Sequence, residues 1–184
     1  PLLVPLLKEP CPVERMSAVY ALGRNPCSEA VDILLNILSQ DSNAYVRRAS
    51  AWSLGNYPDA PVLYPLISSL HEDVAAVRLW ASSSLADIGS SSIKKAEIAA
   101  NELLVSLQID NEPGVRSNCV WSLGRLYLHL NQELQDKMVE AIITVLLNDL
   151  EPSVRYEARI ALEQIENPQV QERFQRLLSE GLLI

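Results

Sequence analysis

The sequence predicts an all-α fold, a solenoid in which similar helical hairpins follow one another along the chain. Three observations support this prediction: a segment that recurs five times without a gap, an acidic residue at a constant distance before a repeated arginine, and amphipathic helical patterns between the copies. No segment shows a sustained alternation of apolar and polar residues, so we expect no strands.

The recurring segment carries an arginine near its start, then small residues, then a leucine. Its five copies begin at Glu14, Val46, Val77, Val115 and Val154. Their arginines are separated by 32, 31, 38 and 39 residues, and repeats of this length are typical of helix-pair solenoids. We expect a single domain over residues 1–184, with repeats at roughly 1–26, 27–58, 59–91, 92–130 and 131–166 and a C-terminal capping helix at 167–184.

An acidic residue stands six positions before each repeat arginine. The five pairs are Glu9 and Arg15, Asp41 and Arg47, Glu72 and Arg78, Asp110 and Arg116, and Asp149 and Arg155. A carboxylate in the loop before a helix is favoured by the helix dipole, and an arginine can bond such acids within or between repeats. We therefore predict a structural ladder of ion pairs and assign it no catalytic role.

Amphipathic helices are expected between the copies, at residues 28–40, 60–70, 93–108 and 132–148. A last helix is expected from Asn167 to about residue 180, because Pro168 suits the first turn of a helix. Residues 1–7 resemble the end of a helix that is already under way, so we expect further residues upstream.

The composition argues against several classes of protein. The net charge is −8, with 15 basic against 23 acidic residues, which disfavours nucleic acid and acidic lipid surfaces as partners. No apolar run approaches the roughly 20 residues that span a membrane, so no membrane insertion is expected. The cysteines Cys11, Cys27 and Cys119 show no CxxC spacing, which favours a reducing compartment and a cytoplasmic location.

No nucleotide-binding, serine-hydrolase or zinc-protease motif occurs, so we assign no catalytic residue. We also assign no metal site. Cys11 and Cys27 are the only candidates, and they would need a further ligand from a partner. Cys119 occupies a position that is small in every repeat, and we expect it to be structural.

Helical geometry gives each repeat copy a buried face and an outer face. Positions such as Val46, Ser50 and Leu54 fall on the buried face, whereas Trp80 borders it and is expected to be structural. The outer face carries large side chains that suit a protein interface: Met16, Tyr20, Arg48, Trp52, Leu79, Trp121 and Tyr156. We predict that these residues form a partner-binding groove. The alternative is that they lie flat and pack against neighbouring helices.

The acid, the Val-Arg pair, the small residues and the final Leu-Gly, as in Val46-Arg47 to Leu54-Gly55, resemble the HEAT-like repeats of the cyanobacterial phycobilin lyases and their relatives. The resemblance covers essentially the whole chain. That family includes bilin lyase subunits, phycobilisome-degradation factors and relatives that interact with the iron–sulfur assembly protein IscA. The resemblance implies a HEAT-type α-solenoid in which the second helix of each repeat lines the concave side, but a repeat identifies function poorly.

Three functions remain open. The leading hypothesis is a non-enzymatic adaptor or chaperone-like scaffold of phycobiliprotein or phycobilisome metabolism, with a phycobiliprotein subunit held in the groove. The resemblance also implies a bilin lyase or lyase subunit acting on phycobiliprotein cysteines, or an iron–sulfur assembly scaffold that docks a cluster carrier. We expect no cofactor except a bilin or a cluster that arrives through a partner. Arg48, Arg125 and Arg159 could pair with acidic groups of a partner or with bilin propionates, or stay solvated.

Overall fold

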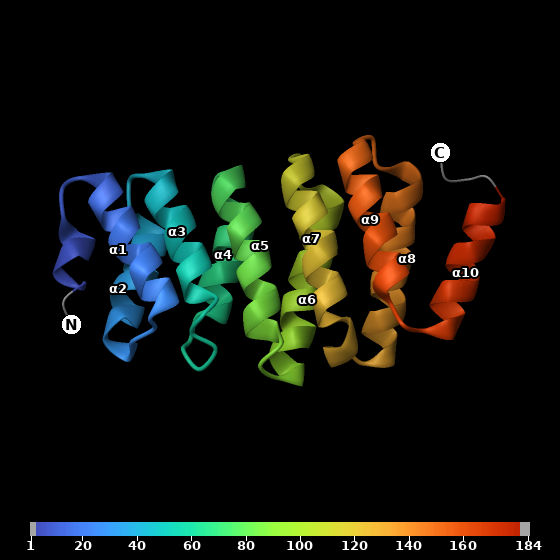
Figure 1. The fold of residues 1–184 in the computed structure, drawn as a ribbon, viewed down its shortest axis with the longest axis horizontal. Coiled ribbons are helices and arrows are strands. Elements are labelled where there is room, and N and C mark those ends of the chain that lie inside the picture. The colour runs from blue at the N-terminus through green and yellow to red at the C-terminus, as the bar shows by residue number, and fades with distance from the viewer. Residues whose placement is uncertain (1–2, 181–184) are drawn as a thin grey trace.

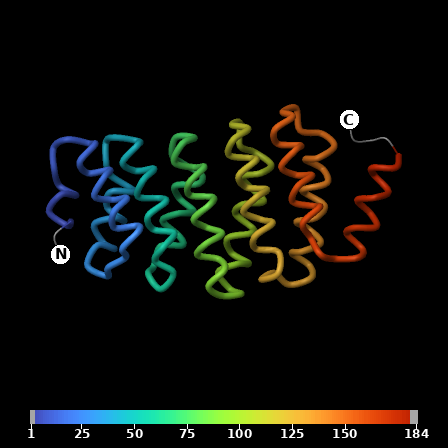
Figure 2. The backbone as a smooth tube through the Cα atoms, in the orientation of Figure 1, coloured from blue at the N-terminus to red at the C-terminus, as the bar shows by residue number. Residues whose placement is uncertain are grey.

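Ten α-helices follow one another in the computed structural model, which describes residues 3–180. Successive helices are antiparallel neighbours, and the hairpins stand side by side in one row, with the two ends of the chain at opposite ends of the row (Figures 1 and 2). No strand occurs in the described residues. The predicted all-α solenoid is therefore confirmed.

The row has two layers of helices (Figure 1). Each odd-numbered helix packs against the next odd-numbered helix, and each even-numbered helix contacts the next even-numbered one. The odd layer consists of α1 (Pro12–Arg24), α3 (Ala44–Leu54), α5 (Ala75–Gly89), α7 (Pro113–Leu126) and α9 (Pro152–Gln164). The even layer consists of α2 (Val31–Gln40), α4 (Leu63–Glu72), α6 (Ile93–Ile109) and α8 (Gln132–Asn148), and α10 (Pro168–Ser179) closes the C-terminal end.

Short 3-10 helices join this framework at Pro5–Lys8, Ser28–Ala30 and Tyr127–His129. The expected helix end at residues 1–7 thus appears as a 3-10 turn from Pro5 onward, and residues 1–2 lie outside the described chain. Helix starts follow local chemistry. Proline stands in the first turn of α1, α7, α9 and α10, and side-chain oxygens of Asn43, Ser92, Asn131 and Asn167 accept a backbone N–H in the first turn of their helices.

Small residues allow the odd helices to approach one another closely. Ser84 of α5 donates to the carbonyl of Ala51 in α3 at 2.8 Å, and Ser50 donates to the carbonyl of Leu34 in α2 at 2.7 Å. A side chain at Gly55 would come within 2.7 Å of the Ser84 hydroxyl. Val46, Ser50 and Leu54 are all fully buried, which confirms the predicted core face of the repeat.

Ion pairs link the loops of neighbouring repeats along one edge of the solenoid. Four of the five repeat arginines reach forward to the acid of the next repeat, and the two bonds of each to the carboxylate measure 2.6–2.9 Å. The four pairs are Arg15–Asp41, Arg47–Asp73, Arg78–Asp110 and Arg116–Asp149. The third guanidinium nitrogen bonds back to a carbonyl of the preceding loop, such as the carbonyl of Asp41 for Arg47 at 2.8 Å. Each arginine therefore joins two loops.

The structure corrects three members of the predicted ladder. Asp73, not Glu72, receives the bonds of Arg47, and Glu72 accepts a bond from Ser68 instead. The loop between α4 and α5 is one residue shorter than the loop between α2 and α3, so the residue directly after α4 is Asp73, five positions before Arg78. The Asp73 carboxylate also accepts the Val74 N–H at 2.7 Å. Glu9 contributes its backbone carbonyl to Arg15, and Arg155 bonds only to carbonyls of Asp149 and Leu150 within the described residues.

The ladder shifts the acid–base behaviour of its carboxylates. Burial raises the pKa of Asp41, Asp73 and Asp110, but the bonds from an arginine and a backbone N–H outweigh burial, so each pKa lies below its ordinary range. At Asp149 the bond from Arg116 is the largest influence, and it also lowers the pKa.

We expect acid to destabilise the chain through these aspartates. Because their folded pKa values are lowered, their contribution is complete above the unfolded pKa of about 3.9 and is lost as the pH falls below about 4. The thermal unfolding midpoint, followed by circular dichroism, should change little from about pH 7 to 5 and drop steeply below about 4. An Asp110→Asn variant should show a shallower drop. Parallel pH profiles for the two chains would contradict this assignment.

Candidate protein-binding groove

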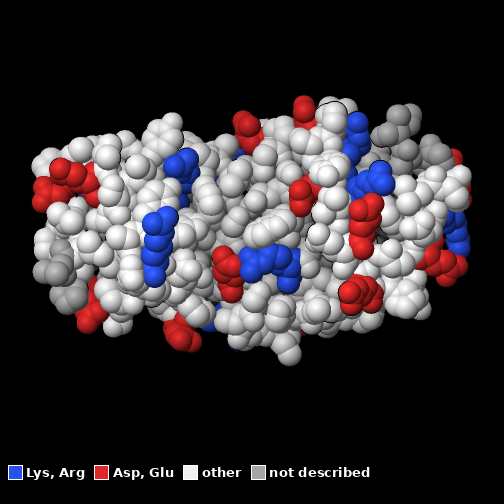
Figure 3. Space-filling model, viewed as in Figure 1, with Lys and Arg blue, Asp and Glu red and all other residues white. Residues whose placement is uncertain are grey.

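A hollow of about 560 Å³ opens on the face of the odd-numbered helices. We call it the Trp hollow, because Trp52 of α3, Trp80 of α5 and Trp121 of α7 line it. The remaining lining residues belong to α5, α7 and α9: Ser83, Asp87, Gly114, Ser117, Asn118, Ser153 and Glu157. Figure 3 shows this face, on which most of the surface is uncharged and the charged side chains are scattered. The hollow thus combines aromatic surface with a few polar groups, as binding sites commonly do.

Trp52 forms one wall of the Trp hollow and also packs within the solenoid. Its ring lies 5.3 Å from that of Tyr20, centre to centre, at a tilt of 55°. It also covers Gly23, where an added side-chain carbon would lie 2.4 Å from the indole. The ring therefore packs against its neighbours with one side and lines the hollow with another.

Trp121 is more open, with 41% of its surface exposed. The guanidinium of Arg125 lies over its ring, 4.9 Å from the ring centre, and also pairs with Asp87 at 2.6 Å. The ion pair with Asp87 holds the Arg125 side chain along the helix face, so that its guanidinium stacks on the Trp121 indole. Both partners of Arg125 are therefore residues of this chain. Arg159 likewise pairs with Glu163 on its own helix.

Sequence reasoning missed four residues of the Trp hollow. Trp80, which we expected to be structural, is half-buried and lines it. Asn118 donates to the carbonyl of Leu79 at 3.0 Å and to the hydroxyls of Ser82 and Ser83 at 2.7 Å. Asp87 and Glu157 supply its carboxylates. The sequence contained a signal for three of them. Trp80, Asn118 and Glu157 each stand three positions after the valine of their repeat, so the solenoid places them in one row.

The other residues predicted for the groove do not line the Trp hollow. Met16 and Leu79 are half-buried and pack against the core. Tyr20 supports Trp52 and accepts a bond from Arg48 at 3.4 Å, while Arg48 also lies over the ring of Tyr45. Tyr156 is 65% exposed on α9, outside the hollow. The predicted groove is thus shorter than expected and centred on α5 and α7.

The cysteines lie apart from the Trp hollow. Cys119 is buried, and burial raises the pKa of its thiol. Cys11 is exposed before α1, and Cys27 is half-buried beside Tyr57, whose hydroxyl accepts the backbone N–H of Cys27. Within residues 3–180, no group of three or more possible metal ligands comes together.

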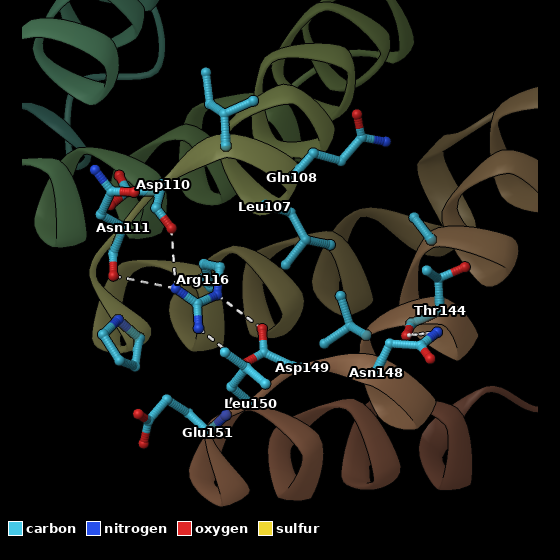
Figure 4. A pocket seen from close by; sticks show the side chains of 14 residues that line it. Leu107, Gln108, Asp110, Asn111, Arg116, Thr144, Asn148, Asp149, Leu150 and Glu151 are labelled. Atoms are coloured by element: carbon cyan, nitrogen blue, oxygen red, sulfur yellow. Dashed lines mark hydrogen bonds and ion pairs between the residues drawn. The ribbon is translucent and has the colours of Figure 1, made fainter.

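A second hollow, of about 590 Å³, lies at the edge of the solenoid between the loops that precede α7 and α9 (Figure 4). Three of its four charged groups belong to the ladder: Arg116 bonds to Asp149 at 2.7 Å and to the carbonyl of Asp110 at 2.9 Å, and Asp110 pairs with Arg78. Figure 4 shows these bonds crossing the hollow, with Leu107 and Leu150 beside them. Because the ladder occupies these groups, we take the Trp hollow as the candidate site.

The arrangement defines a class of protein, an α-solenoid with an aromatic hollow on one helix layer. The family model for HEAT repeats matches residues 1–86, and helical hairpins of the same kind continue to α9. No curated protein is detectably similar to it in sequence. No helix of the described residues combines the length and apolar character needed to cross a bilayer.

Solved structures share the fold. The complex of CpcE and CpcF of phycocyanin lyase from Nostoc sp. PCC7120 matches with a TM-score of 0.70 and 21% identity, over 97% of this chain and 69% of that chain. A designed armadillo repeat protein in complex with the peptide (KR)4 matches with a TM-score of 0.64 and 20% identity, over 97% of each chain. At these identities the likeness concerns the fold: the chain is a repeat solenoid that resembles a phycocyanin lyase subunit and designed peptide-binding proteins.

Proposed function

We propose that the chain is a non-enzymatic scaffold that holds an extended segment of a partner protein in the Trp hollow. The observation that carries this proposal is the convergence of Trp52, Trp80 and Trp121 on one open hollow. Large aromatic side chains dominate the energy of protein interfaces, and three of them share this one open surface. The fold supports the same idea, since a similar solenoid was solved with a bound peptide.

The proposed setting is phycobiliprotein or phycobilisome metabolism in the cytoplasm of a cyanobacterium. It is supported by the likeness of the fold to the phycocyanin lyase complex and by the repeat pattern of the sequence. The proposed partner is accordingly a phycobiliprotein subunit.

Titration of a purified apo-phycobiliprotein subunit, followed by calorimetry, tests this function. We expect a Trp52→Ala/Trp121→Ala chain to bind at least about 30-fold more weakly, because loss of a central aromatic contact typically costs 2 kcal/mol or more. Trp121→Ala alone should weaken binding in the same direction, and its exposed ring makes misfolding an improbable cause.

Tyr64 offers a matched control, since it is an aromatic residue of α4 in the other layer and is 69% exposed. Tyr64→Ala should bind as the wild type does. Equal affinities for the wild type and both tryptophan variants would exclude the Trp hollow as the interface.

A bilin lyase subunit is the second candidate, because the fold likeness to the phycocyanin lyase complex extends over 97% of this chain. To reach bilin propionates, Arg125 and Arg159 would exchange their exposed partners Asp87 and Glu163, which costs little because surface ion pairs are weak. Mixing the chain with phycocyanobilin and an apo-subunit should produce an absorbance shift if it acts as a lyase. An unchanged spectrum would eliminate this candidate.

A further inference from the structure

The charges around the Trp hollow do not balance. Its lining includes two carboxylates, Asp87 and Glu157, and no lysine or arginine. Asp87 is neutralised from outside the lining by Arg125, at 2.6 Å. Glu157 has no hydrogen bond and no ion pair within residues 3–180. The hollow therefore carries one uncompensated negative charge.

The position of Glu157 disfavours the charged form of its side chain. It is half-buried on α9, and burial raises the pKa of its carboxyl. Its place in the register aligns it with Asn118 and Trp80, so it faces the same surface as the aromatic wall. A partly buried carboxylate without a partner is stabilised most by a cation that enters beside it.

The aromatic wall suits the same ligand. The face of an indole attracts cations, and the chain already shows the geometry where Arg125 lies over Trp121 at 4.9 Å. The amide nitrogen of Asn118 shares its two hydrogens among the three acceptors named above, while its side-chain oxygen accepts no bond within the described residues. An acidic group would meet repulsion from Glu157 instead.

We propose that the Trp hollow takes a lysine or arginine side chain of the partner segment, with its charged head paired to Glu157 and its stem along the tryptophan rings. This inference rests on the proposed function and specifies the chemistry of the partner: an extended basic segment. Long cationic side chains bury their aliphatic stems on apolar surface while the head finds a charge, which fits a hollow with aromatic walls and an acid on one side.

Peptides of matched length test the proposal directly. We would titrate the chain with short peptides in which serine alternates with lysine, arginine, glutamine or glutamate, and follow tryptophan fluorescence and calorimetry at about 0.15 M salt. The lysine and arginine peptides should bind about tenfold more tightly than the glutamine peptide, and the glutamate peptide least. The Glu157→Gln chain should bind the lysine peptide no more tightly than it binds the glutamine peptide.

Glu133→Gln is the matched control, because it removes the same charge from an exposed position of α8 in the other layer. It should leave the preference for lysine unchanged. If both glutamine variants weaken binding equally, the overall charge of −8 attracts the peptide and the proposal is overturned. No measurable binding of the lysine peptide to the wild type also overturns it.

The Trp hollow as a protein-binding site and a basic side chain as its occupant are tested separately. Equal binding of lysine and glutamine peptides, lost in Trp121→Ala, would leave the hollow as a protein-binding site and reject the basic side chain as its occupant. Binding that survives in Trp121→Ala would place the interface elsewhere, and would reject both the proposed function and its basic partner.

Discussion

An Asp110→Ala chain is expected to lose about 3 kcal/mol of stability, visible as a lower urea midpoint by circular dichroism. The carboxylate of Asp110 is 6% exposed, takes two bonds from Arg78 at 2.7 Å, and caps the N–H of Glu112 at 2.9 Å. Alanine removes all three bonds and leaves a guanidinium, 19% exposed, with only the carbonyl of Asp73 as its partner. The loss should be large because an uncompensated charge remains near the interior.

Asp87→Ala provides the contrast. This aspartate also pairs with an arginine of the neighbouring repeat, but both side chains are more than 40% exposed. Its removal should change stability by less than about 0.5 kcal/mol. Replacing both Arg78 and Asp110 by leucine should cost less than Asp110→Ala alone, since no charge is left unpaired. Equal losses for Asp110→Ala and Asp87→Ala would show that the ladder does not hold the loops together.

Phe174→Ala is expected to detach the last helix from the solenoid. Phe174 is 1% exposed and anchors α10 together with Val170, which is 8% exposed. Truncation of a buried phenylalanine typically costs about 3–5 kcal/mol, and α10 has few other contacts with the chain apart from those to α9. Hydrogen exchange should show fast exchange over residues 168–179, and the exposed end of α9 should favour aggregation.

The adjacent Arg173 is the control for the same helix. It pairs with Glu140 of α8, but the two side chains are 45% and 60% exposed. Arg173→Ala should therefore leave exchange in α10 nearly unchanged. If exchange rises equally in both variants, the surface ion pair and not the apolar anchor holds the cap in place.

Helix positions and the buried face were predictable because each depends on local pattern. The valine, the small residue four positions on and the leucine recur in each copy, and a helix places them on one side. The recurring arginines also indicated that the ion-pair ladder lies at the start of the repeat helices. The sequence alone did not show that four of the arginines reach forward, as Arg15 does to Asp41 across 26 residues. The spacing of six left pairing within or between repeats open, and the carboxylate pairs of the structure join different repeats.

The candidate site was predicted less well, because it is made by neighbouring helices. Trp52 and Trp121 were predicted from the outward position they share, but Trp80 was assigned to the core by its angle alone. In the structure, the Trp80 ring is half-buried and lines the Trp hollow. Met16 and Leu79 were expected in the groove, yet adjacent helices cover part of their surface.

By itself the sequence determined the all-α repeat architecture, the helix starts, the buried face and the acidic character of the chain, since these follow from periodicity, capping and composition. The tertiary structure alone decided which acid each arginine meets, which aromatic rings share a hollow, and that Asp87 is paired while Glu157 has no partner among residues 3–180. The physical reason is that a single helix sets only the direction of a side chain. Its exposure and its charge partner depend on how closely the next repeat packs, and small residues such as Gly23 and Gly55 set that distance.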